Sequence, residues 1–317
     1  PPLPPGQVQP AVPPTPYVAP VARPPITKAD YTNSVGMDFM RIRAGTMLAG
    51  AYEPCVIMPP DPTPRPAAAP TPPPAPAAAA APDLTPLAPV TPGRFTCPTT
   101  YGTQRPGWSP EQYARAEEMV RQATVPGFIV TMKKPYLMGR YEVTQGEWKK
   151  VMGSNPSIFQ GAKVKDDADR HPVENVTWAD AKAFVAKLNQ LEKTTAYRLP
   201  TEMEWEWAAR AGAFRAPSIP GENAMAHVGM QGPTAPVGTK APNAFGLYDV
   251  IGNVWEWVDD FYNEKIVPGP TPPTSGKTHV LKGGSYMSHV NDLGSAIHAG
   301  GPGDPFTTGF RIVKDAP

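Results

Sequence analysis

The chain has 317 residues, a formal net charge of +1 and 46 prolines. The near-neutral charge gives no general attraction to nucleic acid or anionic lipid, and the longest apolar runs are far too short to span a membrane. The prolines concentrate in residues 1–25 and 59–92, which cannot bury enough apolar surface to offset the ordering of their backbone. About 250 residues remain, enough for one substantial hydrophobic core.

The distribution of prolines predicts the domain organisation. We expect a Pro-rich extended arm over residues 1–33 and one folded domain over residues 34–317, interrupted by a Pro/Ala-rich insertion at 55–125. An extended arm of 25 residues reaches about 75 Å, and polyproline segments dock on aromatic grooves at low entropic cost. We therefore expect the arm and the insertion to contact other protein subunits. The alternative is a flexible spacer behind a membrane anchor or a cleaved signal.

The N-terminus and the cysteines bear on the cellular location. The chain begins with Pro1 rather than Met, which fits either a removed export signal or a trimmed chain. Its two cysteines, Cys55 and Cys97, flank the second Pro-rich run. They are either unrelated thiols or a disulfide that closes this loop, and a disulfide requires an oxidising compartment. We expect an extracytoplasmic protein, in a bacterial periplasm or on a cell surface.

The first elements of the domain are strands and one helix. Residues 34–53 contain a short alternating segment followed by Ala-Gly turns, which predicts a β-hairpin. After Trp108, Ser109 is a good N-cap and Pro110 suits the first helical position, so a helix should run to the stop at residues 125–127. Residues 128–144 return to the composition of strands.

Three helices should follow, because three threonines each precede an acidic residue by three positions. In such a capping box the hydroxyl accepts from a free backbone N–H and the carboxylate reaches back to the cap. The pairs are Thr144/Glu147, Thr177/Asp180 and Thr201/Glu204. The middle helix places its apolar residues on one face, namely Ala181, Phe184, Val185, Leu188 and Leu191.

The last third of the chain has a different composition. Residues 213–317 are rich in Gly, Pro, Asn and Trp and contain only short apolar pieces. Such a segment needs tight turns and buried aromatic rings to define its structure, and tryptophans bury large areas at low entropic cost. The sequence therefore predicts a compact α+β domain with little regular secondary structure.

A set of motifs now stands out in chain order: GRYEVTQGEW (139–148), NPS (155–157), HPVENVTWADAKAF (171–184), YRLPTEMEWEWAARAG (197–212), TAPVGTKAPNAFGLYDVIGNVWEWVDDFY (234–262), LKGGSYMSH (281–289) and GFRIV (309–313). Together they closely resemble the formylglycine-generating enzyme, or sulfatase-modifying factor, family over residues 34–54 and 126–314. The resemblance implies that family's variant of the C-type lectin fold, with Pro-rich extensions. It also makes the stretch after Cys55 an insertion.

The motif LYDVIGNVWEW holds two acidic residues, Asp249 and Glu256. From the residues alone, an Asp that caps a turn and a Glu paired with a nearby Arg is the simpler interpretation. The resemblance instead implies a Ca²⁺ ion, held by these two side chains and by the carbonyls of Val250, Gly252 and Val254. With the resemblance we expect one structural calcium ion. A second calcium site of the family would need an Asp near residues 227–232, where this chain has no acidic residue.

The stretch after GGSYM decides the expected chemistry. In catalytic members of the family, one cysteine follows immediately and a second comes five residues later; the pair binds copper(I), activates O₂ and oxidises a substrate cysteine to formylglycine. This chain has Ser288 and Leu293 there, and hydroxyls bind copper(I) poorly. We expect no copper and no such catalysis. The remnant would be an inert residual cleft lined by Trp255, Ser285, Tyr286, Ser288 and His289.

Other chemistry stays open at this point. His289 and His298, with Asp292 and Asp304 nearby, could form a two-histidine, one-carboxylate iron site, although loop histidines usually only form hydrogen bonds. Three functions are compatible with the sequence. The first is a non-catalytic binding or scaffold subunit of a larger assembly. The second is an oxidoreductase-type enzyme of altered chemistry in the residual cleft, and the third is a display lectin whose loop at 288–308 varies to bind ligands.

Overall fold

The computed structural model describes residues 28–52, 125–214, 233–265, 267–288, 294–302 and 304–316, with isolated residues at 109, 111, 118, 122 and 228. Both cysteines, His289 and Leu293 lie outside these residues, as do nearly all of the Pro-rich arm, the insertion and the helix predicted after Trp108. Within the described ranges, no helix is long and apolar enough to cross a membrane.

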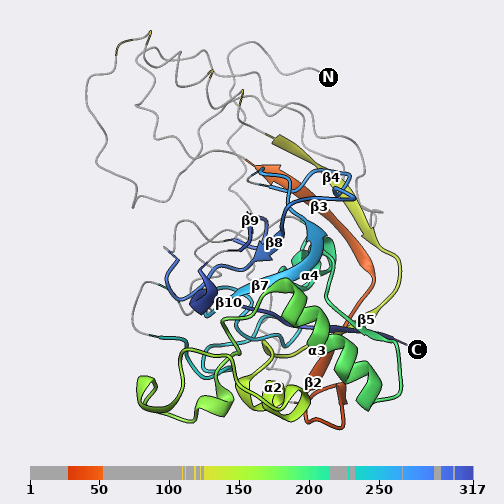
Figure 1. Cartoon of the computed structure of the whole chain (residues 1–317). Coiled ribbons are helices and arrows are strands. Elements are labelled where there is room, and N and C mark those ends of the chain that lie inside the picture. The colour runs from red at the N-terminus through yellow and green to blue at the C-terminus, as the bar shows by residue number, and fades with distance from the viewer. Residues whose placement is uncertain are drawn as a thin grey trace, which may run out of the picture.

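The described residues form a mixture of helices and short strands, as expected for an α+β domain (Figure 1). The helical elements are α2 (Gln145–Met152), η1 (Gly161–Lys163), η2 (Ala168–Arg170), α3 (Trp178–Leu191), α4 (Glu202–Ala209) and η5 (Pro305–Thr307). The strands are β1 (Tyr31–Thr32), β2 (Asp38–Ile42), β3 (Gly45–Tyr52), β4 (Val125–Met132), β5 (Tyr136–Gly139), β6 (Tyr197–Arg198), β7 (Trp255–Phe261), β8 (His279–Lys282), β9 (His298–Gly300), β10 (Thr308–Gly309) and β11 (Val313–Asp315).

The strands form three sheets. One has the order β1-β2-β5-β11-β6, the second the order β10-β7-β8-β9, and the third consists of β3 and β4. Strand β11 lies between β5 and β6 in the first sheet. Its residue Val313 pairs with Met138 of β5 on one side and with Arg198 of β6 on the other. Only β10 and β7 run parallel; the other pairs within the described residues are antiparallel.

The β-hairpin predicted over residues 34–53 is wrong in its pairing, although both strands exist. β2 pairs with β1 and β5, whereas β3 pairs with β4. A two-residue hairpin turn needs positive φ at one or both central residues. The residues that link β2 to β3 are Arg43 and Ala44, and neither has a positive φ. The chain therefore passes from one sheet into the next instead of turning back.

Residues on both sides of the predicted boundaries make contacts with the domain. Asp30 accepts a hydrogen bond from Arg41 N at 2.7 Å, and Tyr31 starts β1. Val125 pairs with Tyr52 at the end of the β3–β4 ribbon. The arm over residues 1–33 and the insertion at 55–125 stay predictions, because most of their residues lie outside the described ranges.

All three capping boxes are confirmed. In α2, α3 and α4 the threonine hydroxyl accepts from the N3 amide, and the acidic N3 side chain accepts from the cap amide. The predicted inner face of α3 is confirmed for its first four residues, which are buried. Leu191 is the exception at 57% exposed, because it is the last residue of the helix, beyond the sheet that α3 covers.

Two apolar cores hold these layers together. One lies between the first sheet and helices α2 and α3, where Trp148 stacks on Phe184 at 5.4 Å between ring centroids. The other surrounds α4 and contains Trp205 and Trp207, packed against β3 and the segment 245–258. Buried tryptophans therefore connect the layers, as the composition predicted.

Candidate functional site

The predicted calcium segment forms a tight turn between the two cores. Asp249 and Asn253 both have left-handed backbones, with φ of 54° and 57°. The Asp249 carboxylate accepts from Gly238 N at 2.6 Å, and the Asn253 side chain donates to Glu142 Oε2 at 2.7 Å. Asn253 Oδ1 also accepts from Ala235 N at 2.9 Å. Side-chain hydrogen bonds thus fix the turn to residues distant in the sequence.

Glu256 lies at the centre of a buried ion pair. Its Oε1 accepts from Arg311 Nη2 at 2.6 Å, and its Oε2 accepts from Arg311 Nε at 2.7 Å and from Trp205 Nε1 at 2.6 Å. Bidentate pairs of this kind are among the strongest hydrogen-bonded contacts in proteins. Although burial opposes the charge of Arg311, the Glu256 carboxylate raises the pKa of the guanidinium above its usual value.

Two further carboxyl groups lie near this pair. Burial, followed by repulsion from Asp249 and Glu256, raises the pKa of Glu142 well above its ordinary value. Burial also raises the pKa of Asp249 to about 6. Three buried acids therefore face one arginine, and two of them have a raised affinity for protons.

These residues do not fit a calcium ion with Glu256 as a ligand. Both carboxylate oxygens of Glu256 already accept hydrogen bonds from N–H groups. The guanidinium of Arg311 supplies the positive charge that a calcium ion would otherwise provide. Asp249 closes a turn by accepting from Gly238 N. This is the arrangement that the residues alone suggested. Calcium at Asp249, Val250, Gly252, Val254 and Glu256 stays a prediction that rests on the resemblance only.

We expect removal of calcium to leave the thermal midpoint unchanged. A calcium site saturated at 100 times its Kd would add about 2.7 kcal/mol of stability, which is a midpoint shift of roughly 5–10 °C for a domain of this size. Thermal unfolding in EGTA and in excess CaCl₂ measures the difference. A calcium-dependent shift of several degrees, together with stoichiometric calcium by elemental analysis, would show that Glu256 exchanges Arg311 for the ion.

Four of the five residues predicted to line the residual cleft lie within the described ranges. Ser285 N donates to Ser288 Oγ at 3.0 Å, and Ser288 N donates to Ser285 O at 2.9 Å. The hydroxyl at the first of the family's cysteine positions thus closes a local turn. Tyr286 lies edge-on to Phe159 at 5.7 Å, and Trp255 is only partly buried beside the first core. The structure brings Ser285, Tyr286 and Ser288 together, while His289 lies outside the described residues.

A buried acid next to this turn escaped the sequence analysis. Glu174 is fully buried, and its Oε1 accepts from Phe159 N at 2.8 Å. Burial raises the pKa of Glu174 from 4.5 to about 7, although backbone amides oppose the rise. Burial, followed by the charge of Glu174, raises the pKa of Tyr286 to about 12.

The raised pKa of Glu174 predicts that the free energy of unfolding falls as the pH rises. The pKa of Glu174 is higher in the folded protein than in the unfolded chain. Between about pH 4.5 and 7, Glu174 therefore ionises in the unfolded chain first, which stabilises the unfolded state relative to the folded state. At 1.36 kcal/mol per pH unit, the loss amounts to about 3 kcal/mol at most. We expect Glu174→Gln, which keeps the oxygen that accepts from Phe159, to remove this loss. Urea unfolding at pH 5 and pH 8 measures it; an equal pH dependence in both proteins would contradict the assignment.

His298 belongs to a second buried ion cluster. Its Nδ1 lies 2.7 Å from Glu202 Oε1, and its Nε2 lies 2.5 Å from the carbonyl oxygen of Lys265. Both ring nitrogens of His298 are therefore engaged by oxygen atoms of the domain. Lys282 completes the cluster, with Nζ 3.4 Å from Glu202 and 3.3 Å from Glu206.

This cluster overturns the idea of an iron site that includes His298. A metal ligand needs a nitrogen lone pair, and neither nitrogen of His298 has one free in this arrangement. Among the residues that the structure describes, no group of three His, Cys, Asp or Glu side chains is placed to hold a metal ion. His289 and Asp292 lie outside that part of the chain.

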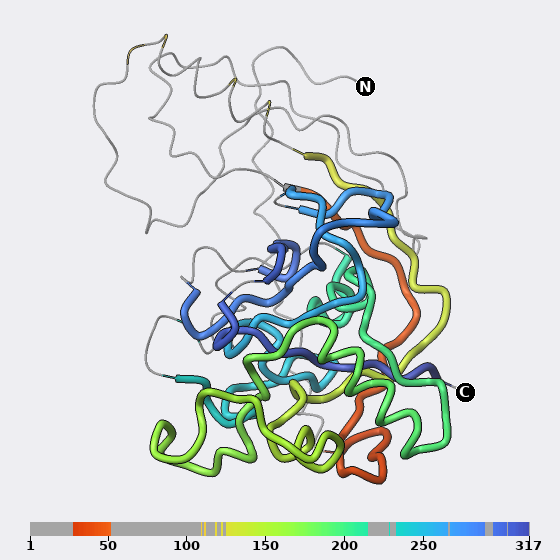
Figure 2. The backbone as a smooth tube through the Cα atoms, in the orientation of Figure 1, coloured from red at the N-terminus to blue at the C-terminus, as the bar shows by residue number. Residues whose placement is uncertain are grey.

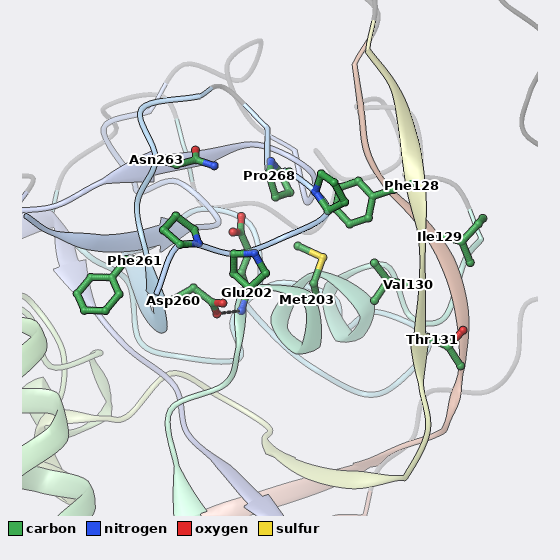
Figure 3. Close-up of a pocket in the computed structure, with 14 residues that line it drawn as sticks. Phe128, Ile129, Val130, Thr131, Glu202, Met203, Asp260, Phe261, Asn263 and Pro268 are labelled. Atoms are coloured by element: carbon green, nitrogen blue, oxygen red, sulfur yellow. Dashed lines mark hydrogen bonds between the residues drawn. The ribbon is translucent and has the colours of Figure 1, made fainter. Parts of the chain in front are cut away.

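One cavity of about 290 Å³ lies between β4 and the start of α4 (Figure 3). In Figure 3, Phe128 and Val130 lie on one side with Pro268 next to Phe128, Met203 lies below them, and Phe261 lies on the opposite side. Asp260 accepts from Glu202 N at 2.6 Å, and the Glu202 carboxylate is bound to Lys282 and His298. The acids at this cavity are therefore committed to structure rather than to chemistry.

The basic partners in both ion clusters were not predicted from the sequence. Arg311 belongs to the motif GFRIV, and Lys282 to LKGGSYMSH, but only the fold shows which acids they pair with. One local signal was present, because Glu206 and Arg210 stand four residues apart on a helix and form a buried pair. The remaining pairs join residues more than 50 positions apart, for which the sequence has no comparable pattern.

Comparison with known proteins places these features in context. A family model described as "Sulfatase-modifying factor enzyme 1-like domain" matches residues 90–316. The formylglycine-generating enzyme of Mus musculus is 34% identical over 169 residues, which cover 46% of this chain and 42% of that protein. The formylglycine-generating enzyme of Streptomyces coelicolor is 34% identical over 199 residues, which cover 53% and 61%.

A solved structure shows the same architecture. Treponema denticola variable protein 1 aligns with a TM-score of 0.52 and 30% identity, over 60% of this chain and 88% of that one. The match spans less than two thirds of the length of the two enzymes named above.

Proposed function

Since the chain belongs to the sulfatase-modifying factor enzyme 1-like domain family, with its variant of the C-type lectin fold, we propose that it is a catalytically inactive binding or scaffold subunit of a larger assembly. The assembly lies outside the cytoplasm. The Pro-rich arm and insertion contact the other subunits, and the folded domain anchors them.

One observation carries this proposal. Ser288 and Leu293 occupy the two positions at which catalytic relatives carry copper-binding cysteines. A hydroxyl and an isobutyl group do not replace two soft thiolates around copper(I). The Ser288 hydroxyl is also engaged, because it accepts from Ser285 N at 3.0 Å. The chain therefore keeps the framework of the family without the groups that activate O₂.

Two neighbouring functions have weaker support. An enzyme with altered chemistry would need a nucleophile and a base in reach of each other, whereas Ser285 and Ser288 bond to one another and His298 is committed to Glu202. A ligand-binding lectin is the second candidate, because the chain resembles a protein whose name describes it as variable. Sequencing close relatives distinguishes it, since hypervariability confined to residues 288–308 is expected only of a display lectin.

The scaffold proposal predicts that partners depend on the arm. Deleting residues 1–27, and not 1–33, spares the hydrogen bonds of Asp30 and the strand β1. Affinity purification under native conditions should recover the same partners in stoichiometric amounts with the full chain and lose them with the deletion. Circular dichroism of both proteins confirms that the domain is intact. Unchanged partners after the deletion would rule out the arm as their binding element.

A further inference from the structure

A second cavity, of about 720 Å³, opens at the N-terminus of α3; we call it the Trp178 groove. It is lined by Asn175, Val176, Thr177, Trp178, Ala179, Trp257, Tyr262, Glu264, Lys277, Thr278, His279, Gly301, Pro302 and Pro305. Four of these residues carry aromatic rings, and Glu264 and Lys277 are exposed. None belongs to the ion clusters or to the residual cleft.

The rings of the groove are held rigidly. His279 is sandwiched between Trp178, at 3.7 Å and 3° between rings, and Phe261, at 4.4 Å and 27°. Trp178 Nε1 donates to Val258 O at 3.1 Å, and Trp257 Nε1 donates to Val176 O at 3.0 Å. Their polar atoms are thus satisfied by the domain. Trp257 is buried and both faces of His279 are covered, so the partly exposed rings of Trp178 and Tyr262 supply the aromatic surface for a ligand. Their fixed geometry lowers the entropic cost of binding.

Gly301 lines the groove, and its neighbour Gly300 lies against the Tyr262 ring. A Cβ atom on Gly300 would lie 2.1 Å from the Tyr262 ring, and one on Gly301 would lie 2.0 Å from the Trp257 ring. The rings therefore rest directly on the backbone of this segment. Pro302 follows at the rim. The result is a shallow aromatic surface rather than a deep pocket for a small molecule.

The chemistry of this surface fits a polyproline helix. Such a helix is preformed, exposes apolar rings and leaves its backbone carbonyls without internal partners. Aromatic grooves bind it by packing against the prolines and donating hydrogen bonds to those carbonyls. Tyr262 supplies the donor, because its hydroxyl has no hydrogen bond to any residue that the structure describes. The Lys277 ammonium is a second donor at the rim.

We propose that the Trp178 groove binds a polyproline segment, and that its occupant is residues 13–20 of the same chain. Their sequence is PPTPYVAP. The proposal rests on the proposed function only in treating the Pro-rich arm as a binding element. It adds the site on the domain that the arm binds and the class of ligand that fits there.

The length of the arm supports this occupant. Tyr31 donates to Glu192 at 3.3 Å, so the described chain starts beside the C-terminus of α3 (Figure 2), whereas the groove lies at its N-terminus. Helix α3 has 14 residues and is therefore about 21 Å long. A polyproline segment covers that distance in about seven residues at 3.1 Å each. Counting back about seven residues from Tyr31 gives residue 24, so the segment before it, which includes residues 13–20, is long enough to reach the groove.

Tethering makes occupation by the same chain favourable. A short flexible link gives an effective concentration on the order of 1 mM. A segment that binds in trans with a Kd of about 100 µM would then fill its own groove about 90% of the time. The groove of the full chain should consequently be closed to an added peptide until the arm is weakened.

The test uses two full-length proteins and one peptide. The peptide contains residues 10–22 and carries a fluorescent label; the second protein carries Pro13→Ala, Pro16→Ala and Pro20→Ala. Fluorescence anisotropy should give a Kd for the arm variant that is about tenfold lower than for the unaltered chain. Adding Tyr262→Phe, which keeps the ring on Gly300 and removes the hydroxyl, should weaken binding about fivefold.

Several results would overturn the proposal. They are no binding to the arm variant, equal binding to both proteins, or no effect of Tyr262→Phe. Tighter binding of a peptide from residues 66–80 would assign the groove to the insertion instead. A dimer that dissociates in the arm variant would assign it to a second copy. Loss of partners in the purification experiment leaves this assay unaffected, so the two proposals fail separately.

Discussion

Replacing Arg311 with Gln is expected to lower the free energy of unfolding by about 3–5 kcal/mol. The guanidinium is fully buried and is the partner of Glu256 through two hydrogen bonds. It is also the cation nearest to Glu142 and Asp249, whose pKa values are already raised by burial. Without Arg311 these acids would be buried without compensation, which costs far more than the loss of a surface pair. Urea unfolding at pH 7 measures the change.

A matched control separates burial from loss of charge. Lys149 and Asp169 form an ion pair in which both side chains are more than 40% exposed, so Lys149→Gln should cost less than about 1 kcal/mol. Combining Arg311→Gln with Glu256→Gln should recover part of the loss, because an amide does not leave a buried charge. A cost for Arg311→Gln no larger than that of the control would contradict the central role of this pair.

Lys282→Met is expected to cost about 3 kcal/mol or more at neutral pH. The ammonium has no exposed surface and lies between Glu202 and Glu206, above the ring of Trp205. Methionine fills a similar volume, so the loss measures the uncompensated carboxylates rather than a cavity. Arg210 still pairs with Glu206 in the variant, and His298 with Glu202, which keeps the domain foldable.

The pH dependence of this variant distinguishes electrostatics from packing. Although burial opposes it, Lys282 and His298 lower the pKa of Glu202. In the unaltered protein this stabilisation is present above the unfolded pKa and is lost as the pH falls through the folded pKa. Removing Lys282 raises the folded pKa, so the deficit of the variant should be largest near pH 7 and should shrink below about pH 4.5. A deficit of constant size would indicate lost packing.

Local patterns in the sequence predicted local structure well. The three capping boxes depend only on residues three positions apart, and all three form. The pairing of β2 and β3 was not predictable in the same way, because their partners β5 and β4 come later in the chain, β4 after residues 53–124. Leu191 fits the apolar periodicity of α3, but its side chain is exposed. Periodicity alone does not reveal where along a helix the packing partner ends.

The candidate site shows the same distinction. A Glu paired with an Arg was one of two interpretations of Glu256, and the fold selects it by bringing up Arg311 from 55 residues away. The low accessibility of Glu174 and the two polar contacts of the His298 ring depend on contacts made after folding. Ser288 is different, because its chemistry is a property of the residue type, and the fold only adds the turn that engages its hydroxyl.

The most direct test of the central claim is an oxidation assay with a sulfatase-type cysteine peptide. The purified chain is supplied with copper(I), O₂ and a thiol reductant, and mass spectrometry follows conversion of the peptide cysteine to formylglycine. A variant with Ser288→Cys and Leu293→Cys, which restores two soft ligands, serves as the comparison in a copper(I) titration. We predict no aldehyde from the unaltered chain, and copper(I) binding only in the variant. Formation of aldehyde by the unaltered chain would contradict the claim that this domain has lost its catalytic chemistry.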